Sequence, residues 1–308
     1  DLIKAFRSTA HARNPRDCLC ILIDPLLSNP LSELDSIKQV PARTLGFRHD
    51  DLAIEDTPYL LQVGREQDHE RLVSHTLRLA LAEQKSALLE SPASRSVCAW
   101  LFVDKDDLFK LADALSRLAL IAQPGSHGKR KLFRFWDPRV FQHLSRILGK
   151  QTLEGALPDK LTVQWLWLEP SGQLSSHIFS NGHGWRPSPT EWASLVRIED
   201  LNQCLFLSET QQRVDSSNHI VALDHSLQRA TELGCGEAVD RITYALLSMS
   251  LGGYFENHPL MTDLFRQVAR DQASLAALAE VVEQDVWDQI KNDMAQAHAH
   301  QKSGISTQ

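Results

Sequence analysis

The chain has 308 residues and a formal net charge of -7 at pH 7, with 39 acidic and 32 basic side chains. Its length suits two domains, and a hydrophobic fraction of 43% excludes a disordered chain. The negative charge argues against general nucleic-acid binding, and the sequence has no apolar run of the roughly 18 residues that a membrane span needs. The five cysteines lack CxxC spacing, so we expect reduced thiols in a cytoplasmic protein.

Strand and helix signals alternate in the first half of the chain. Short apolar runs predict strands, and leucines and alanines at spacings of three and four predict helices. Asp104 is expected to cap the second of these helices. Alternation of this kind predicts an α/β arrangement, with an N-terminal mixed sheet and covering helices. The predicted strands are 18–23, 44–47, 59–63 and 96–103, and the predicted helices are 68–89 and 105–119.

The run RFWDPR, residues 134–139, stands between a strand-like stretch and an amphipathic helix. Residues 131–136 alternate between basic and apolar side chains, as in a strand whose aromatic residues pack on a sheet. Asp137 has the position of a helix N-cap, and Pro138 fits the first turn, where its missing N–H costs nothing. Apolar residues then continue at helical spacing up to Gly149, which can end the helix.

This run resembles the RFYDPRV signature of the type VI secretion adaptor proteins, also called effector chaperones. Trp136 stands where that family more commonly has Tyr. The stretch TPYLLQV, residues 57–63, is similar to the PYLV-type strand of the family. The strand from residue 94 and the helix after it resemble the next family region, although residues 114–117 (ALSR) replace its typical His-Leu-Arg. The resemblance covers about the first half of the chain.

The resemblance implies a bacterial adaptor that binds a cognate toxic effector and loads it onto a VgrG-like spike protein of the type VI secretion machine. Such a function is binding and not catalysis, so it implies no catalytic residue, no cofactor, no metal ligand, no nucleic-acid partner and no membrane partner. The candidate partner contacts are basic and aromatic residues: Arg134, Trp136, Arg139, Trp185, Tyr254 and Phe255.

Three of these candidates have equally plain alternatives. Trp185 lies near the expected junction between the two lobes, where packing in the core or between the lobes is favoured over a partner contact. Tyr254 and Phe255 follow Gly252-Gly253, which breaks a predicted helix. Both exposure on a loop and burial against the last helix are open for this pair.

The second half of the chain has a different pattern. Glu169-Pro170-Ser171-Gly172 predicts a hairpin turn between two strands. From about Ser188 onward the helical period dominates. We therefore expect an adaptor domain at 1–182 and a smaller, mainly helical lobe at 183–308, with a mobile tail from Ala295.

Competing hypotheses are a hydrolase and a scaffold subunit of a larger complex. The run 224–226 (DHS) supplies triad residue types, but adjacent helix positions point in different directions and there is no GxSxG elbow. His298 and His300, near Asp293, could bind a metal ion, although an Ala-His tail is also typical of a solvated end.

A basic cluster surrounds the RFWDPR run. It can be a solvated face, a contact for an acidic protein or a nucleic-acid groove with stacking aromatics. Since Phe133, Phe135 and Phe141 suit the core, the first two interpretations are favoured over the third. The cluster consists of Lys129, Arg130, Lys131, Arg134, Arg139, Arg146 and Lys150, against the single acid Asp137.

Overall fold

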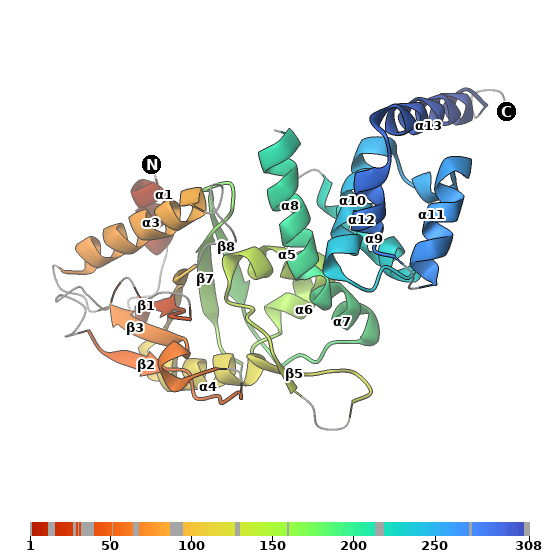
Figure 1. Ribbon diagram of the computed structural model, residues 1–308. Coiled ribbons are helices and arrows are strands. Elements are labelled where there is room, and N and C mark those ends of the chain that lie inside the picture. The colour runs from red at the N-terminus through yellow and green to blue at the C-terminus, as the bar shows by residue number, and fades with distance from the viewer. Residues whose placement is uncertain are drawn as a thin grey trace. The chain divides into compact units, whose positions relative to one another are not determined.

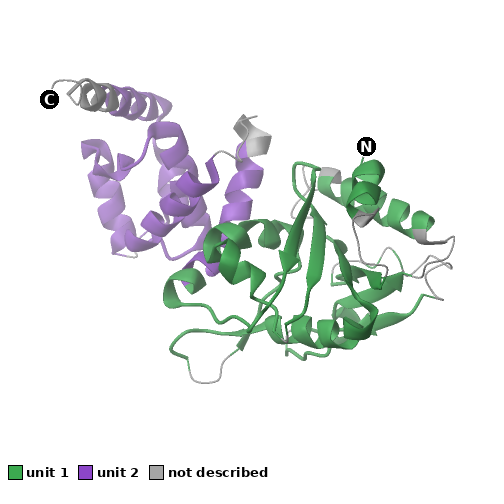
Figure 2. Ribbon diagram, turned by 180° about the vertical axis from the view of Figure 1, so that it is seen from behind, with its two compact units in different colours: residues 1–192 green, residues 193–308 purple. Residues whose placement is uncertain are grey.

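The computed structural model describes residues 2–11, 16–26, 29, 31, 40–50, 52–63, 68–86, 95–126, 130–158, 160–212, 219–270 and 273–304. The chain forms two compact units, residues 1–192 and 193–308 (Figure 2). The sequence placed this boundary after residue 182. The later boundary follows from side-chain packing, because Trp185 lies against Phe133 at 6.2 Å between ring centroids and the Lys131 ammonium lies over the Trp192 ring.

Unit 1 is built on a six-stranded sheet with the order β2-β3-β1-β4-β7-β8 (Figure 1). A separate two-stranded sheet joins β5 to β6. The strands of the large sheet are β1 (Asp17–Ile23), β2 (Ala42–Thr44), β3 (Tyr59–Val63), β4 (Val97–Asp104), β7 (Val163–Leu168) and β8 (Leu174–Phe179), and the small sheet pairs β5 (Leu120–Ala122) with β6 (Arg130–Leu132).

The predicted N-terminal sheet with covering helices is confirmed, but the sheet does not combine parallel and antiparallel pairs. Every pairing among the described strands is antiparallel. The helix α3 (Asp68–Ser86) joins β3 to β4, which run parallel to each other, as a strand-helix-strand pattern suggests. However, β1 lies between these two strands and pairs with each of them antiparallel, so no parallel pair forms.

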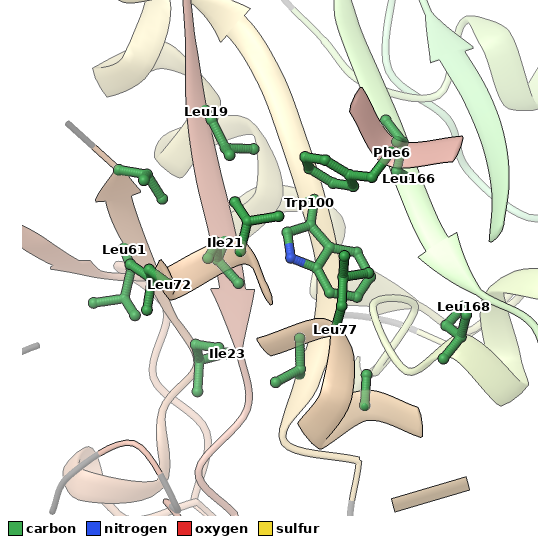
Figure 3. Packing of buried hydrophobic residues seen from close by; sticks show 14 of the residues in the cluster. Phe6, Leu19, Ile21, Ile23, Leu61, Leu72, Leu77, Trp100, Leu166 and Leu168 are labelled. Carbon is green, nitrogen blue, oxygen red and sulfur yellow. The ribbon is translucent and has the colours of Figure 1, made fainter. Parts of the chain in front are cut away.

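One face of the large sheet packs against α1 (Leu2–His11) and α3 (Figure 3). Leu19, Ile21 and Ile23 alternate along β1 and all point into this core, as the two-residue period of a strand requires. The Phe6 ring of α1 meets the Trp100 ring edge-on, with centroids 6.0 Å apart. The Trp100 indole N–H donates to Thr76 Oγ1 at 3.0 Å, so the one polar group of this side chain is satisfied.

The opposite face of β7 and β8 is aromatic and lies under α5 (Pro138–Leu148). Trp165 and His177 stand directly opposite each other in the β7–β8 register and therefore share this face. The Phe141 ring of α5 stacks on Trp165 with centroids 4.8 Å apart and packs edge-on against Trp167 at 4.8 Å. The helix that follows the RFWDPR run is thus anchored to the sheet by its first turn. The remaining helical elements of unit 1 are η1 (Ile54–Asp56), η2 (Lys105–Asp107), α4 (Leu108–Leu118) and α6 (Lys150–Glu154).

Asp104 caps η2, which leads directly into α4, and its carboxylate accepts from the Asp106 N–H at 2.9 Å. The expected helix after the fourth predicted strand is therefore present with its predicted cap. The predicted hairpin is also present, since β7 pairs with β8 across the turn 169–173.

Every described secondary-structure element of unit 2 is a helix, which confirms the predicted mainly helical lobe. Its elements are α8 (Ile198–Gln212), α9 (Ile220–Glu232), α10 (Ala238–Leu251), η4 (Phe255–Asn257), α11 (Pro259–Ala269), α12 (Leu275–Val281) and α13 (Gln284–Gly304), while α7 (Pro189–Val196) spans the boundary. Helix α13 continues through most of the segment expected to form a mobile tail, and residues 305–308 lie outside the described chain.

Buried carboxylates connect the helices of unit 2. Asp200 on α8 pairs with Arg241 on α10 at 2.7 Å. Glu256 of η4 accepts from Arg229 on α9 at 3.1 Å and from the Tyr244 hydroxyl on α10 at 2.8 Å. Each pair joins two elements, so removal of one partner would leave a charge without its counterion in a largely dry environment. No helix in the described ranges has the length and apolar character needed to cross a membrane.

Candidate functional site

The RFWDPR run forms a capped turn at the start of α5. The Asp137 side chain accepts from the backbone N–H of Arg139 at 2.9 Å, Pro138 lies in the first turn, and Gly149 follows the helix with a φ of 75°. These features agree with the sequence prediction. The predicted strand over 131–136 is wrong beyond Leu132, where β6 ends. The chain turns instead, since the Asp137 N–H donates to the Arg134 carbonyl at 3.1 Å.

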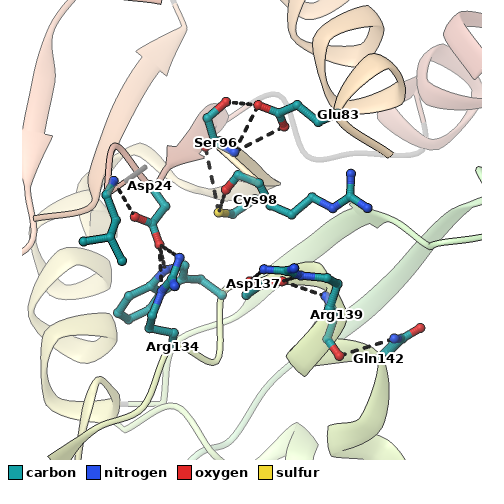
Figure 4. Close-up of polar contacts among 11 residues, drawn as sticks. Asp24, Glu83, Ser96, Cys98, Arg134, Asp137, Arg139 and Gln142 are labelled. Atoms are coloured by element: carbon teal, nitrogen blue, oxygen red, sulfur yellow. Dashed lines mark hydrogen bonds and ion pairs between the residues drawn. The ribbon is translucent and has the colours of Figure 1, made fainter. Parts of the chain in front are cut away.

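Asp24, just beyond the end of β1, accepts hydrogen bonds from side chains in the first half of the run (Figure 4). Its Oδ2 accepts from Arg134 Nη2 at 2.8 Å, from Arg134 Nε at 3.2 Å and from the Trp136 indole N–H at 2.6 Å. Its Oδ1 accepts from the Leu26 N–H at 3.1 Å. The side chain is 3% exposed, so all of these bonds form with little competition from water.

In the second half of the run, Arg139 pairs with Asp137 of the same run. Arg139 donates from Nε to Asp137 Oδ1 at 3.0 Å and from Nη2 to Asp137 Oδ2 at 2.6 Å, a two-pronged pairing. Burial opposes the charged carboxylate, but the hydrogen bonds and charge of Arg139 outweigh it and lower the pKa of Asp137. Asp137 therefore acts both as the helix cap and as the acceptor that holds Arg139.

A second set of hydrogen bonds lies beside this network, at the start of β4. The Asp24 N–H donates to the Ser96 carbonyl at 2.8 Å, and the Ser96 N–H donates to the Glu83 carboxylate at 3.2 Å. Ser96 Oγ donates to the same carboxylate. Burial raises the pKa of Glu83, and burial together with the nearby charge of Arg139 lowers the pKa of Arg95. Through Asp24, Ser96 and Glu83 the motif is connected to β1, β4 and α3.

The one thiol of this network does not have the properties of a nucleophile. It belongs to Cys98, which is 1% exposed, and burial raises its pKa well above the usual value. A nucleophilic cysteine needs the reverse, an accessible thiol with a lowered pKa. The side chains of Arg134, Trp136 and Arg139 bond to carboxylates of the same chain, and these bonds hold the turn between β6 and α5 against the end of β1.

The first three candidate contacts meet in this network. Arg134 and Arg139 point their guanidinium groups at buried carboxylates, with side chains 28% and 23% exposed. Trp136 is 1% exposed. Its expected place in a partner interface therefore does not fit the folded chain, in which the indole contacts Phe47 and Phe135.

The other three candidates lie elsewhere. Trp185 is half-buried against Phe133, and its indole N–H has no acceptor within the described chain. Phe255 is fully buried between Tyr244 and Phe265, so burial is the correct alternative for this residue. Tyr254 beside it is 56% exposed and has a φ of 65°, a left-handed conformation that is uncommon for a residue other than glycine.

Sequence reasoning missed the acceptor of the motif. Asp24 followed by Pro25 at the end of an apolar strand was the available signal, because an acid in that position is rarely buried without a partner. Apart from Tyr254, it also did not single out the large apolar side chains that unit 2 exposes. Among the described residues of that unit these are Val196, Val221, Val239, Tyr254, Leu260 and Val281.

The residues of the proposed triad and of the proposed metal site do not form such sites in the described chain. In the DHS run, Asp224 is paired with Arg197 and Ser226 donates to Ser248, so these groups do not converge. No set of three or more potential metal-binding side chains occurs in the residues that the structure covers, and the side chains of His298 and His300 are not among them. Of the basic cluster, Lys129 lies outside the described residues.

Comparison with known families gives a match over part of unit 1. Residues 22–154 match the family described as "Domain of unknown function (DUF4123)", a family associated with type VI secretion adaptors. The matched segment contains both Asp24 and the RFWDPR run, and it ends within unit 1. The comparison with curated proteins found no match, and neither did the comparison with solved structures.

Proposed function

We propose that the protein is a cytoplasmic type VI secretion adaptor that binds a cognate toxic effector and loads it onto a VgrG-like spike protein. The observation that carries this proposal is the family match over residues 22–154, which coincides with the segment that bears the RFWDPR run. The proposed activity is binding, with no reaction catalysed.

The two units suggest a division of labour. The matched segment lies in unit 1 and would carry the contact shared with other adaptors, whereas unit 2 lies outside the match and would select this chain's own effector. Six of the nine large apolar side chains exposed in the described residues belong to unit 2, which favours this assignment. Among them Tyr254 is the best anchor, since aromatic residues are enriched in the energetic centres of interfaces.

The buried network supports a structural role for the motif. Asp24 and Asp137 accept hydrogen bonds from Arg134, Trp136 and Arg139 within the folded chain. The run would therefore shape a binding surface without itself touching the partner. Loss of the network would then weaken partner binding indirectly, through the fold of unit 1.

The test is co-expression of the chain with the effector and the spike protein encoded beside its gene, followed by affinity capture. We expect the effector to be retained, and its solubility to depend on the chain. Tyr254→Ala should reduce effector retention at least about tenfold while leaving the fold unchanged, because interface anchors often contribute 2 kcal/mol or more. Phe109→Ala, at an exposed aromatic residue of unit 1, is the matched control and should retain the effector. Recovery of the chain without effector or spike protein would refute the proposal.

A further inference from the structure

Arg95, which stands just before β4, carries a buried guanidinium group without a partner. The residue is 8% exposed. Its Nη1 is fully enclosed and has no hydrogen-bond acceptor within the part of the chain that the structure describes. The other enclosed nitrogen atoms without a partner in that part belong to tryptophan and histidine rings, so Arg95 is the permanently charged side chain among them. Because a buried charge is unfavourable unless it is paired, an anion is expected beside it.

The two carboxylates whose charges act on Arg95 are bonded to other groups. Asp137 pairs with Arg139 at 2.6 Å, and Glu83 accepts from the Ser96 N–H at 3.2 Å. Burial and the charge of Arg139 lower the pKa of Arg95, despite the opposing charges of Asp137 and Glu83. The positive charge of Arg95 is therefore only partly compensated within the described chain.

Hydrogen bonds hold the backbone from which the Arg95 side chain extends (Figure 4). The Arg95 carbonyl accepts from the Cys98 thiol at 3.4 Å. The neighbouring Ser96 carbonyl accepts from the Asp24 N–H at 2.8 Å, and the Ser96 N–H donates to Glu83. The start of the side chain is thus fixed before any ligand arrives, so less conformational entropy is lost on binding.

We propose that Arg95 binds a carboxylate group of a partner protein, beside the network that holds the RFWDPR run. A guanidinium group can donate two parallel hydrogen bonds to the two oxygen atoms of a carboxylate. An exposure of 8% admits a slender group, such as the end of an acidic side chain, and not a bulky ligand. The net charge of -7 disfavours capture of free anions, whereas a docked partner holds its carboxylate at a high local concentration.

A binding role for Arg95 and a structural role predict opposite effects on stability. Arg95→Met keeps most of the apolar stem and removes a charge that the free chain does not fully compensate, so a binding role predicts no loss of stability. Arg139→Met, in contrast, leaves the buried Asp137 carboxylate without its counterion and should lower the thermal midpoint. If Arg95 were structural, both substitutions would destabilise the chain.

Thermal unfolding at pH 7 in sodium acetate, compared with sodium chloride at equal ionic strength, tests the site without any partner. Acetate at about five times its dissociation constant should raise the wild-type thermal midpoint by about 2–4 °C. Arg95→Met should keep at least the wild-type midpoint in chloride and lose the acetate shift. Arg78→Met, at an exposed arginine of α3, is the matched control and should keep that shift. A wild-type chain that acetate does not stabilise, an equal shift in Arg95→Met, or an Arg95→Met midpoint in chloride clearly below that of the wild type would overturn the inference.

Affinity capture identifies the source of the carboxylate, a step that rests on the proposed adaptor function. Arg95→Met should retain either the effector or the spike protein encoded beside the gene at least about tenfold less than the wild type, because loss of one partner of a buried charge pair weakens binding strongly. Arg78→Met should retain both. Undiminished retention of both by Arg95→Met would overturn the assignment of the carboxylate to these partners. The two proposals fail separately: a wild-type chain that captures neither protein refutes the adaptor function, whereas normal capture without an acetate shift refutes the carboxylate site alone.

Discussion

Substitution of Asp24 by asparagine should destabilise unit 1 severely. Asp24 is 3% exposed and accepts from Arg134 twice and from Trp136 once through a single oxygen. Removal of one partner from a fully buried ion pair costs about 3–5 kcal/mol. The Arg134 side chain is 28% exposed, so water can solvate its charge when the carboxylate is lost and offsets part of this cost. We therefore expect Asp24→Asn to lower the free energy of unfolding by about 3 kcal/mol.

Urea denaturation followed by tryptophan fluorescence measures this change. Six of the seven tryptophans lie at or before residue 192, so the signal reports mainly on unit 1. Glu70→Gln, which breaks the exposed pair between Arg7 and Glu70, is the control and should cost less than about 1 kcal/mol. An Asp24→Asn loss no larger than that of the control would refute a role for Asp24 in holding the motif. In the double variant with Arg134→Met, part of the loss should be recovered, since no uncompensated charge remains.

Further substitutions test the rest of unit 1. Phe141→Ala should cost about 3–5 kcal/mol in urea denaturation, because the ring packs against Trp165 and Trp167, and a loss under about 1 kcal/mol would contradict that packing. Gly182→Ala should lower the thermal midpoint strongly, since its Cβ would lie 1.5 Å from the Leu157 carbonyl oxygen, whereas Gly46→Ala meets nothing closer than 3.9 Å and should change it little. Burial lowers the pKa of His177, so between that lowered value and the usual value of 6.5 the unfolded chain binds more protons than the folded chain. Stability should therefore fall as the pH drops below about 6.5, and the fall should be smaller in His177→Phe; an identical pH profile for both chains would count against this effect.

Local chemistry made much of unit 1 predictable. Asp104 and Asp137 each precede a helix and each accept the expected backbone N–H, because a capping side chain needs only its own neighbours. The direction of strand pairing, in contrast, could not be predicted from neighbouring residues. The insertion of β1 between β3 and β4 depends on contacts between distant segments, and no local pattern encodes it.

The site was predictable in its location and not in its role. The motif residues do gather in one place, but the sequence could not show that Asp24, 110 residues before Arg134, would bury and satisfy their polar groups. Trp136 was expected as a partner contact, and for Phe255 exposure on a loop and burial were both left open. An aromatic side chain suits a core and an interface equally well, so burial had to be seen in the folded chain.

The adaptor function is tested most directly by assembly from purified components. The chain, the effector and the spike protein encoded beside it would be mixed and analysed by size-exclusion chromatography with light scattering. We expect a complex that contains all three proteins, with effector bound to the spike protein only when the chain is present. Full association of effector and spike protein without the chain, or elution of the chain as a free species, would contradict the adaptor function.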